Sequence, residues 1–226
     1  MVKKIVGTGV LLVLALALQA GVKMYTLKSP DGKVKLEVTA GQGIAYSLFY
    51  DGRLLLKPSR IALHTDLPEA DHWENIRITG TKQRHVSETV QAPFYRVKEF
   101  GIDCNELELR LNNGFSLLMR AYNDGMAYRF VAGRKGEMTV VEERAEFNFA
   151  DDFEAYIPYS TNPKDPWNMA FQNFYTKAPL TQYNTELPAF LPLTVDAGAV
   201  KLTLLESDLE AYPGMFVCGD GKTPAL

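Results

Sequence analysis

Apolar and polar residues alternate strictly along several stretches of this chain, which is the pattern of half-buried β-strands. Residues 33–38 read Lys, Val, Lys, Leu, Glu, Val, with every apolar side chain at an even position. Residues 106–111 have the same period, with three leucines separated by charged residues. No apolar stripe of helical period extends beyond about two turns. The pattern therefore predicts a chain that is β almost throughout.

Turn signals separate the predicted strands. Asp51-Gly52 joins strands expected at residues 44–50 and 53–56, and this pair predicts a two-residue hairpin loop of type I′. Asn112-Asn113-Gly114 and Asn123-Asp124-Gly125 flank another strand, expected at residues 115–122. Many short strands with closely spaced turns are typical of an antiparallel β-sandwich.

Residues 160–188 break this pattern and predict one long irregular loop. The segment is rich in Asn, Pro, Gln, Tyr and Thr, and its aromatic side chains argue against disorder. Aromatic rings with interleaved amides suit a carbohydrate-binding surface or a surface that docks another domain. Ordinary packing beneath a long loop is the alternative. The candidate residues for carbohydrate binding or domain docking are Trp167, Phe171, Tyr175 and Tyr183.

The first twenty residues have the pattern of a secretory signal peptide. Lys3 and Lys4 precede a continuous apolar run, and Leu18-Gln19-Ala20 ends it with cleavage expected after Ala20. A retained membrane anchor is the alternative, but the apolar run is shorter than the roughly 20 residues that span a bilayer. The pattern predicts export across the inner membrane, to the periplasm, and a mature domain at residues 21–226.

Composition limits the class of protein. The 226 residues are 46% hydrophobic and 23% charged, with a net charge of −3, which suits one large domain and does not suit nucleic-acid binding. Cys104 and Cys218 are the two cysteines. Both are interpreted as small core residues, and a disulfide between them remains the alternative because sequence does not show their proximity.

No constellation of catalytic residues is evident. Glu142 and Glu143 are neighbours on an extended run, so their side chains face opposite sides. Asp151, Asp152 and Glu154 are typical of a solvated turn. The three histidines do not have metal-ligand spacing. Trp73, which follows an Asp and a His, could contact a sugar, but a core tryptophan is the favoured interpretation.

Several short segments, in order along the chain, resemble the N-terminal domain of glycoside hydrolase family 97. The resemblance implies a large two-sheet antiparallel β-sandwich, the supersandwich of sugar-processing enzymes. The matching segments are Ser29-Pro-Asp-Gly-Lys, Tyr46-Ser-Leu-Phe-Tyr-Asp-Gly, Lys57-Pro-Ser, Ala121-Tyr-Asn-Asp-Gly-Met-Ala-Tyr-Arg-Phe, Val140-Val-Glu-Glu-Arg and Glu206-Ser-Asp-Leu-Glu-Ala-Tyr-Pro-Gly-Met.

The same resemblance implies an exported enzyme that hydrolyses α-glucosidic or α-galactosidic bonds. In that family the catalytic carboxylates lie on a (β/α)8 barrel that follows this domain, and the barrel is expected beyond Leu226. We therefore expect a non-catalytic domain that docks on the barrel, borders its oligosaccharide site and hydrolyses nothing alone. A free-standing exported carbohydrate-binding module is the alternative.

Calcium is the cofactor that the resemblance implies for the intact enzyme. The family's N-terminal domain lends one glutamate to a calcium site that is otherwise built on the barrel. Here Gln172, in the stretch Phe171-Gln172-Asn173-Phe174-Tyr175, is the nearest match, and Glu186 is a second candidate. A Gln can ligate calcium through its carbonyl oxygen but brings no charge. The 226 residues alone are not expected to hold the ion.

Overall fold

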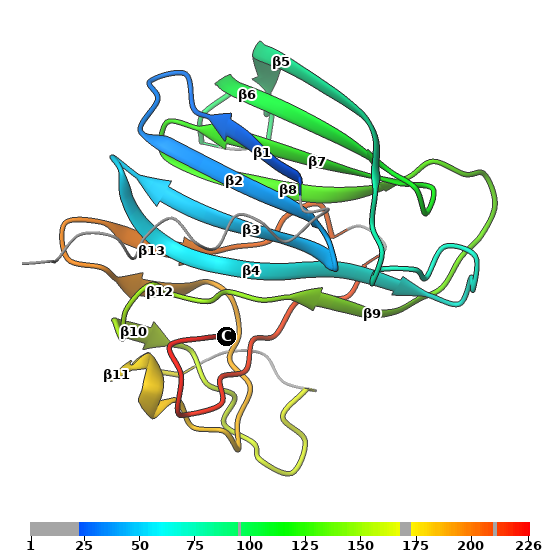
Figure 1. Ribbon diagram of the computed structural model, residues 1–226. Helices are drawn as coiled ribbons and strands as arrows, with labels where there is room; N and C mark the ends of the chain where they lie inside the picture. The colour runs from blue at the N-terminus through cyan, green and yellow to red at the C-terminus, as the bar shows by residue number, and fades with distance from the viewer. Residues whose placement is uncertain (1–22, 95, 168–172, 210–211) are drawn as a thin grey trace, which may run out of the picture.

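The computed structural model describes residues 23–94, 96–167, 173–209 and 212–226. In these ranges the chain forms thirteen strands and one 3-10 helix (Figure 1). The predicted all-β fold is therefore confirmed. No helix within the described ranges is long and apolar enough to cross a membrane. The predicted signal peptide lies outside them and stays a prediction.

The five-stranded sheet contains the first four strands in sequential order, and β9 pairs with the C-terminal part of β4. Between β3 and β4, Asp51 and Gly52 have φ of 48° and 78°, and Tyr50 pairs with Arg53. Positive φ at both positions is what a type I′ turn requires, so the hairpin predicted there is confirmed. The strands lie in the order β1 (Lys23–Lys28), β2 (Val34–Gly41), β3 (Gly43–Tyr50), β4 (Arg53–Thr65), β9 (Val140–Ala145).

A second sheet, which contains β5 to β8 and which we call the hairpin sheet, is a single meander in which each strand pairs with the next one along the chain. The two turns predicted at residues 112–114 and 123–125 join its last three strands. Its first strand, with 14 residues, is the longest of the described strands, and its second has 13, as β4 does. The order is β5 (Ile78–Gln91), β6 (Glu99–Leu111), β7 (Phe115–Tyr122), β8 (Gly125–Ala132).

The short-strand sheet is built from the last third of the chain, and each of its strands has four residues. The predicted irregular loop at 160–188 is wrong in part, because residues 176–182 form β11 and the 3-10 helix η1 (Leu180–Gln182). The order is β11 (Thr176–Pro179), β10 (Glu154–Ile157), β12 (Leu193–Asp196), β13 (Lys201–Leu204).

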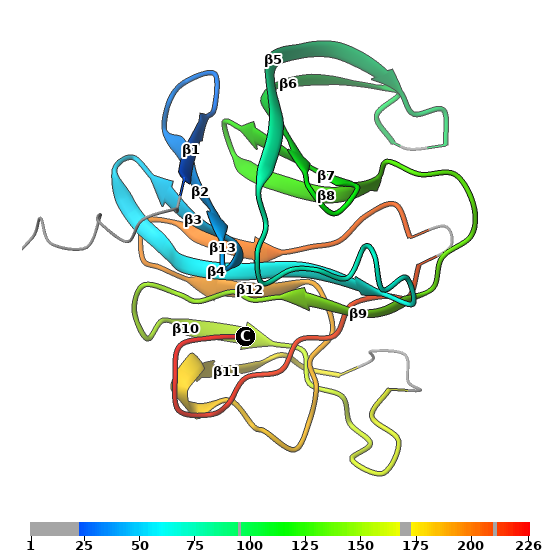
Figure 2. The ribbon, with the colours of Figure 1, turned by 45° about the vertical axis from the view of Figure 1, so that its right-hand side comes forward.

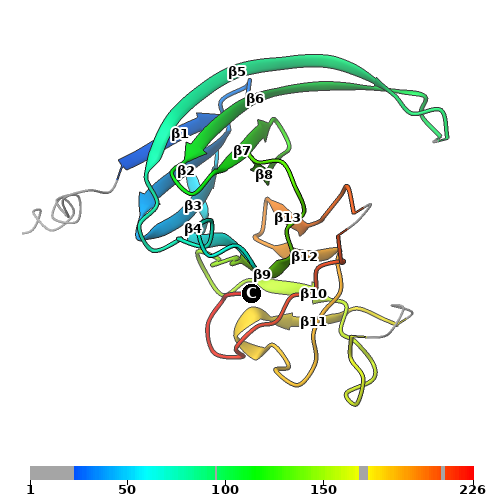
Figure 3. The ribbon, with the colours of Figure 1, turned by 90° about the vertical axis from the view of Figure 1, so that its right-hand side faces the viewer.

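The three sheets form the layers of a sandwich. In Figure 3 the five-stranded sheet lies on the left, with the hairpin sheet and the short-strand sheet above and below on the other side. One core cluster joins all three sheets, through residues such as Leu36 in β2, Leu107 in β6 and Val195 in β12. The predicted sandwich is confirmed, with its second layer divided between two sheets.

Trp73 belongs to this core and not to a sugar-binding surface. Only 4% of the residue is exposed. Its ring meets Phe130 edge-on at 5.3 Å between centroids and lies 6.1 Å from Phe115. The indole Nε1–H donates to the carbonyl of Leu63 in β4 at 3.0 Å. The favoured interpretation of Trp73 is thus confirmed.

The two cysteines have different environments. Cys104 is fully buried in β6, as predicted, and burial raises the pKa of its thiol. Cys218 is exposed, so its interpretation as a core residue was wrong. It follows the buried Val217, and alternation along an extended segment turns the next side chain outward. Both thiols are free.

Candidate functional site

The structure separates the residues predicted for carbohydrate binding or docking. Trp167 and Tyr175 are at the surface, 59% and 42% exposed. Tyr183 is only 3% exposed, so it does not share a surface with them. Phe171 and Gln172 lie outside the described residues, and their roles stay predictions.

Tyr183 is a structural clamp because its ring and hydroxyl are both occupied. The hydroxyl is 2.8 Å from the carbonyl oxygen of Val217 and 3.0 Å from that of Leu187. The ring packs edge-on against Tyr159 at 5.0 Å. It also lies against Gly219, where an added Cβ would approach the ring to 2.7 Å. Burial raises the pKa of Tyr183, so the phenol remains a hydrogen-bond donor.

Three exposed aromatic side chains remain beside the clamp, and we call them the aromatic rim: Trp167, Phe174 and Tyr175. Trp167 meets Phe216 edge-on at 5.2 Å, and Phe216 in turn lies 4.9 Å from Phe190. Phe174 is 92% exposed. Trp167 is therefore packed on rings from other segments, and exposed apolar side chains such as these mediate association.

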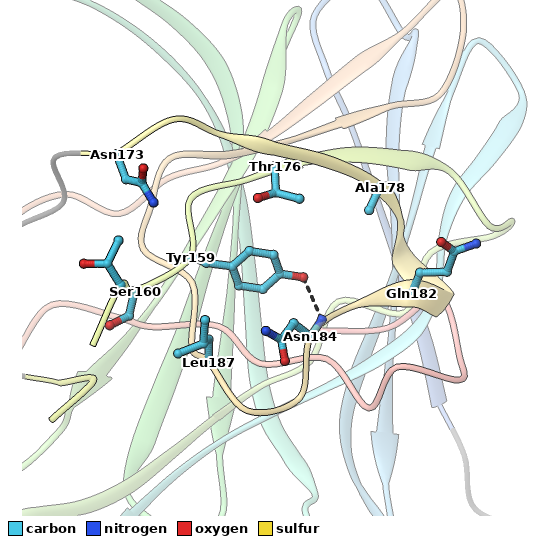
Figure 4. A pocket seen from close by; sticks show the side chains of 9 residues that line it. Tyr159, Ser160, Asn173, Thr176, Ala178, Gln182, Asn184 and Leu187 are labelled. Atoms are coloured by element: carbon cyan, nitrogen blue, oxygen red, sulfur yellow. Dashed lines mark hydrogen bonds between the residues drawn. The ribbon is translucent and has the colours of Figure 1, made fainter. Parts of the chain in front are cut away.

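A pocket of about 450 Å³ opens next to the rim, between β11, η1 and the end of β10. Figure 4 shows Tyr159 in its middle, with Asn173 and Ser160 on one side and Gln182 on the other. The Tyr159 hydroxyl accepts a hydrogen bond of 2.7 Å from the backbone N–H of Asn184. The described lining residues are Tyr159, Ser160, Thr161, Asn173, Thr176, Ala178, Gln182, Asn184 and Leu187.

All described lining side chains of this neutral pocket are uncharged. Amides and hydroxyls can both donate and accept hydrogen bonds, which matches the hydroxyls of a neutral sugar. The same groups contain no carboxyl that could act as an acid or a nucleophile. The neutral pocket can therefore hold part of a polar uncharged ligand, but it offers no means of hydrolysing one.

A second pocket of about 720 Å³ lies between β9 and residues 212–218. Tyr212 crosses it and donates from its hydroxyl to Glu143 Oε2 at 2.8 Å. Burial raises the pKa of Tyr212, and the bond to Glu143 raises it further. This contact connects the late segment to the edge strand β9 and engages one of the three glutamates in the described lining of the pocket.

The described residues do not fit a calcium site by themselves. Nowhere among them do three or more acidic, histidine or cysteine side chains converge. Glu186, the second candidate, is exposed, and its backbone N–H donates to Asn184 Oδ1 at 3.1 Å. One carboxylate is far fewer than the six to eight oxygen ligands that calcium takes.

The family of this chain follows from a match over most of its length. The family model described as "Glycosyl-hydrolase 97 N-terminal" matches residues 27–225. The chain belongs to glycoside hydrolase family 97. The family 97 domain is 41% identical, over 209 residues, to a retaining alpha-galactosidase of Bacteroides thetaiotaomicron. It is 26% identical over 158 residues to a probable retaining alpha-galactosidase of Streptomyces bingchenggensis.

The domain spans about a quarter to a third of these relatives. The match to the Bacteroides protein covers 89% of this chain and 31% of the relative, and the Streptomyces match covers 68% and 24%. A family 97 enzyme from Pseudoalteromonas sp. strain K8, solved with acarbose, has a TM-score of 0.73 at 18% identity, covering 88% of this chain and 31% of that one. A β-arabinopyranosidase structure has a TM-score of 0.60 at 22% identity, covering 78% and 31%. These structural likenesses show the fold.

The sequence did not reveal the neutral pocket. Its lining comes from three separate stretches around residues 159–161, 173–178 and 182–187, which fold back on one another. Tyr159 and Asn184 meet across 25 positions through a hydrogen bond from the Asn184 backbone N–H to the Tyr159 hydroxyl. The one available signal was the density of amides and aromatic residues, which located the segment correctly without identifying the residues that line the pocket.

Proposed function

We propose that this family 97 domain is the non-catalytic N-terminal part of an enzyme that hydrolyses α-galactosidic bonds with retention of configuration. The observation that carries the proposal is the 41% identity, over 89% of this chain, to a relative named as a retaining alpha-galactosidase. An α-glucosidic substrate is the second candidate, and the family 97 enzyme solved with acarbose supports it only through the shared fold.

We assign the chemistry to the part of the full-length protein that the relatives have beyond this domain. A retaining hydrolase needs two carboxyl groups about 5–5.5 Å apart across the glycosidic bond. The neutral pocket has none in its described lining. The domain then serves the reaction by docking on the catalytic barrel and by bordering its oligosaccharide site with the aromatic rim and the neutral pocket.

Calcium enters this proposal only through the intact enzyme. When bound there, the ion would supply positive charge beside the substrate. Gln172 would add one neutral oxygen from this domain, and the remaining ligands would come from the barrel. Because the described residues do not form a site, no step of the domain's own role depends on the ion.

The test is a chimera in which residues 21–226 replace the matched segment of the Bacteroides retaining alpha-galactosidase. We expect the chimera to hydrolyse an aryl α-galactoside with a kcat within about tenfold of the parent. The reason is that a homologous domain presents an equivalent docking surface to the catalytic part. The 226-residue chain alone should show no hydrolysis. The anomeric configuration of the first product, followed by NMR, reports retention.

Two results would contradict the proposal. A folded chimera with no activity on α-galactosides or α-glucosides would show that this domain does not serve the catalytic part. Saturable binding of an oligosaccharide to the isolated chain at micromolar concentration, measured by calorimetry, would instead favour the free-standing binding module. The control is a chimera with Glu108→Gln, a change on a half-buried β6 side chain that does not line the neutral pocket.

A further inference from the structure

The hairpin of β5 and β6 extends beyond the rest of its sheet. Pairing of β6 with β7 ends at Cys104, opposite Tyr122. Beyond that point, residues 87–91 pair with residues 99–103 and, in the described chain, with no third strand. Figure 3 shows this extension, which we call the arm (residues 87–94 and 96–103), arching away from the sandwich. A two-stranded hairpin alone is marginally stable in water, so the arm needs a supporting surface.

The arm has an apolar face and a polar face. Val90 is paired with Phe100, so their side chains share one face, and both are exposed, at 41% and 45%. On the opposite face, Gln91 donates to Glu99 at 2.9 Å. At the tip, Phe94 is 98% exposed. Apolar side chains on a projecting hairpin with no core beneath them indicate a contact surface.

Most of the other exposed apolar residues in the described chain lie in two further segments, the aromatic rim and residues 205–212. Fourteen large hydrophobic residues are exposed in the described chain. Ten of them belong to the arm, to the aromatic rim or to residues 205–212. In Figures 2 and 3 the tip of the arm, the segment around 160–167 and the segment after β13 all extend to the right. In these two views the three segments therefore extend from the same side of the molecule.

We propose that the arm contacts the catalytic part of its own full-length protein, on the same side of the domain as the aromatic rim. The inference rests on the proposed function for the identity of this partner. Chain length favours the catalytic part as this partner. The Bacteroides relative has about twice the length of this domain outside the matched region. Position also favours this partner, because the arm and the rim, which borders the proposed sugar site, face the same side. The arm thereby orients the domain over the site.

Trypsin provides a direct footprint of the arm. Arg96 and Lys98 are exposed at its tip, and cleavage there requires that the hairpin be free to open. We expect cleavage at these two residues to be at least tenfold slower in the chimera than in the isolated 226-residue chain. Phe94→Asp combined with Phe100→Asp should return cleavage in the chimera to the rate of the isolated chain.

Met24→Asp is the matched control, because Met24 is also an exposed apolar residue, at 59%, but lies in β1 on the opposite side in Figure 3. It should leave the arm protected. Equal cleavage rates in the chimera and in the isolated chain would overturn the proposal. Protection that grows with the concentration of the isolated chain, with dimers on size-exclusion chromatography, would also overturn it by assigning the arm to a second copy.

The footprint and the hydrolysis assay fail separately. A protected arm in an inactive chimera would support the docking inference and contradict the proposed function. An active chimera with an unprotected arm would do the reverse. Circular dichroism of the isolated double variant checks that the substitutions, both at exposed positions, leave the fold intact.

Discussion

Replacement of Trp73 by alanine is expected to lower the free energy of unfolding of the isolated domain by about 3 to 5 kcal/mol. The ring fills the space between β4 and the aromatic residues Phe115 and Phe130. Its removal leaves a cavity and deprives the Leu63 carbonyl of its indole donor. Trp73→Phe keeps most of the volume and should cost about 1 to 2 kcal/mol. Urea unfolding followed by circular dichroism measures both.

The control is the other tryptophan of the chain. Trp167 is 59% exposed, so Trp167→Ala should change the free energy of unfolding by less than about 1 kcal/mol. That variant also isolates the fluorescence of Trp73, which should be blue-shifted in the folded state. Equal losses for the two alanine variants would contradict the assignment of Trp73 to the core.

Glu106→Gln is expected to destabilise the domain by about 2 kcal/mol at pH 7. The Glu106 carboxylate is buried in β6 and accepts hydrogen bonds from Arg84 Nε at 2.6 Å and Arg120 Nε at 2.8 Å. Burial pushes its pKa upward, but the two arginines outweigh burial and leave the pKa below its usual range. Both guanidinium groups keep contact with water, which holds the cost below that of a fully buried pair.

The pH dependence has a definite sign. Because the pKa of Glu106 is lowered by folding, its contribution is complete above the pKa of the unfolded state, about 4.3, and is lost as the pH falls through the folded pKa. The difference between wild type and Glu106→Gln should therefore shrink from pH 7 towards pH 3. Glu108→Gln, on the same strand in a partly exposed pair with Arg110 at 3.6 Å, should change stability by less than about 0.5 kcal/mol. A gap that stays constant with pH would refute the argument.

The alternation of apolar and polar residues was enough to locate most strands. Val34, Leu36 and Val38 are all buried, as their period predicted, and so are Leu107, Leu109 and Leu111. Positive φ at Asp51 and Gly52 followed from residue type alone. Local patterns succeed where one residue and its immediate neighbours decide the conformation.

Features that depend on distant partners could not be read in this way. Tyr183 resembled its exposed aromatic neighbours in the sequence. Its contacts with Val217, 34 positions away, and with Tyr159 make it a buried clamp. The division of the second layer into two sheets depends on pairing across long stretches of chain. The arm was missed because residues 87–91 contain one apolar residue and do not alternate, and nothing local shows that the neighbouring strand ends at Tyr122.

The position of the hairpin sheet within the chain has a kinetic consequence. Its four strands pair only with sequence neighbours in that sheet. In contrast, β4 pairs with β9 only after the whole meander has been passed, since Thr65 pairs with Val140. Closing a long loop costs entropy before the contact rewards it, so β4–β9 pairing belongs to the late phase of folding. In pulsed hydrogen exchange during refolding, amides of β6 and β7 should gain protection before those of β9, and the reverse order would disprove this sequence. The sandwich is thus assembled around a meander that forms first and is enclosed afterwards.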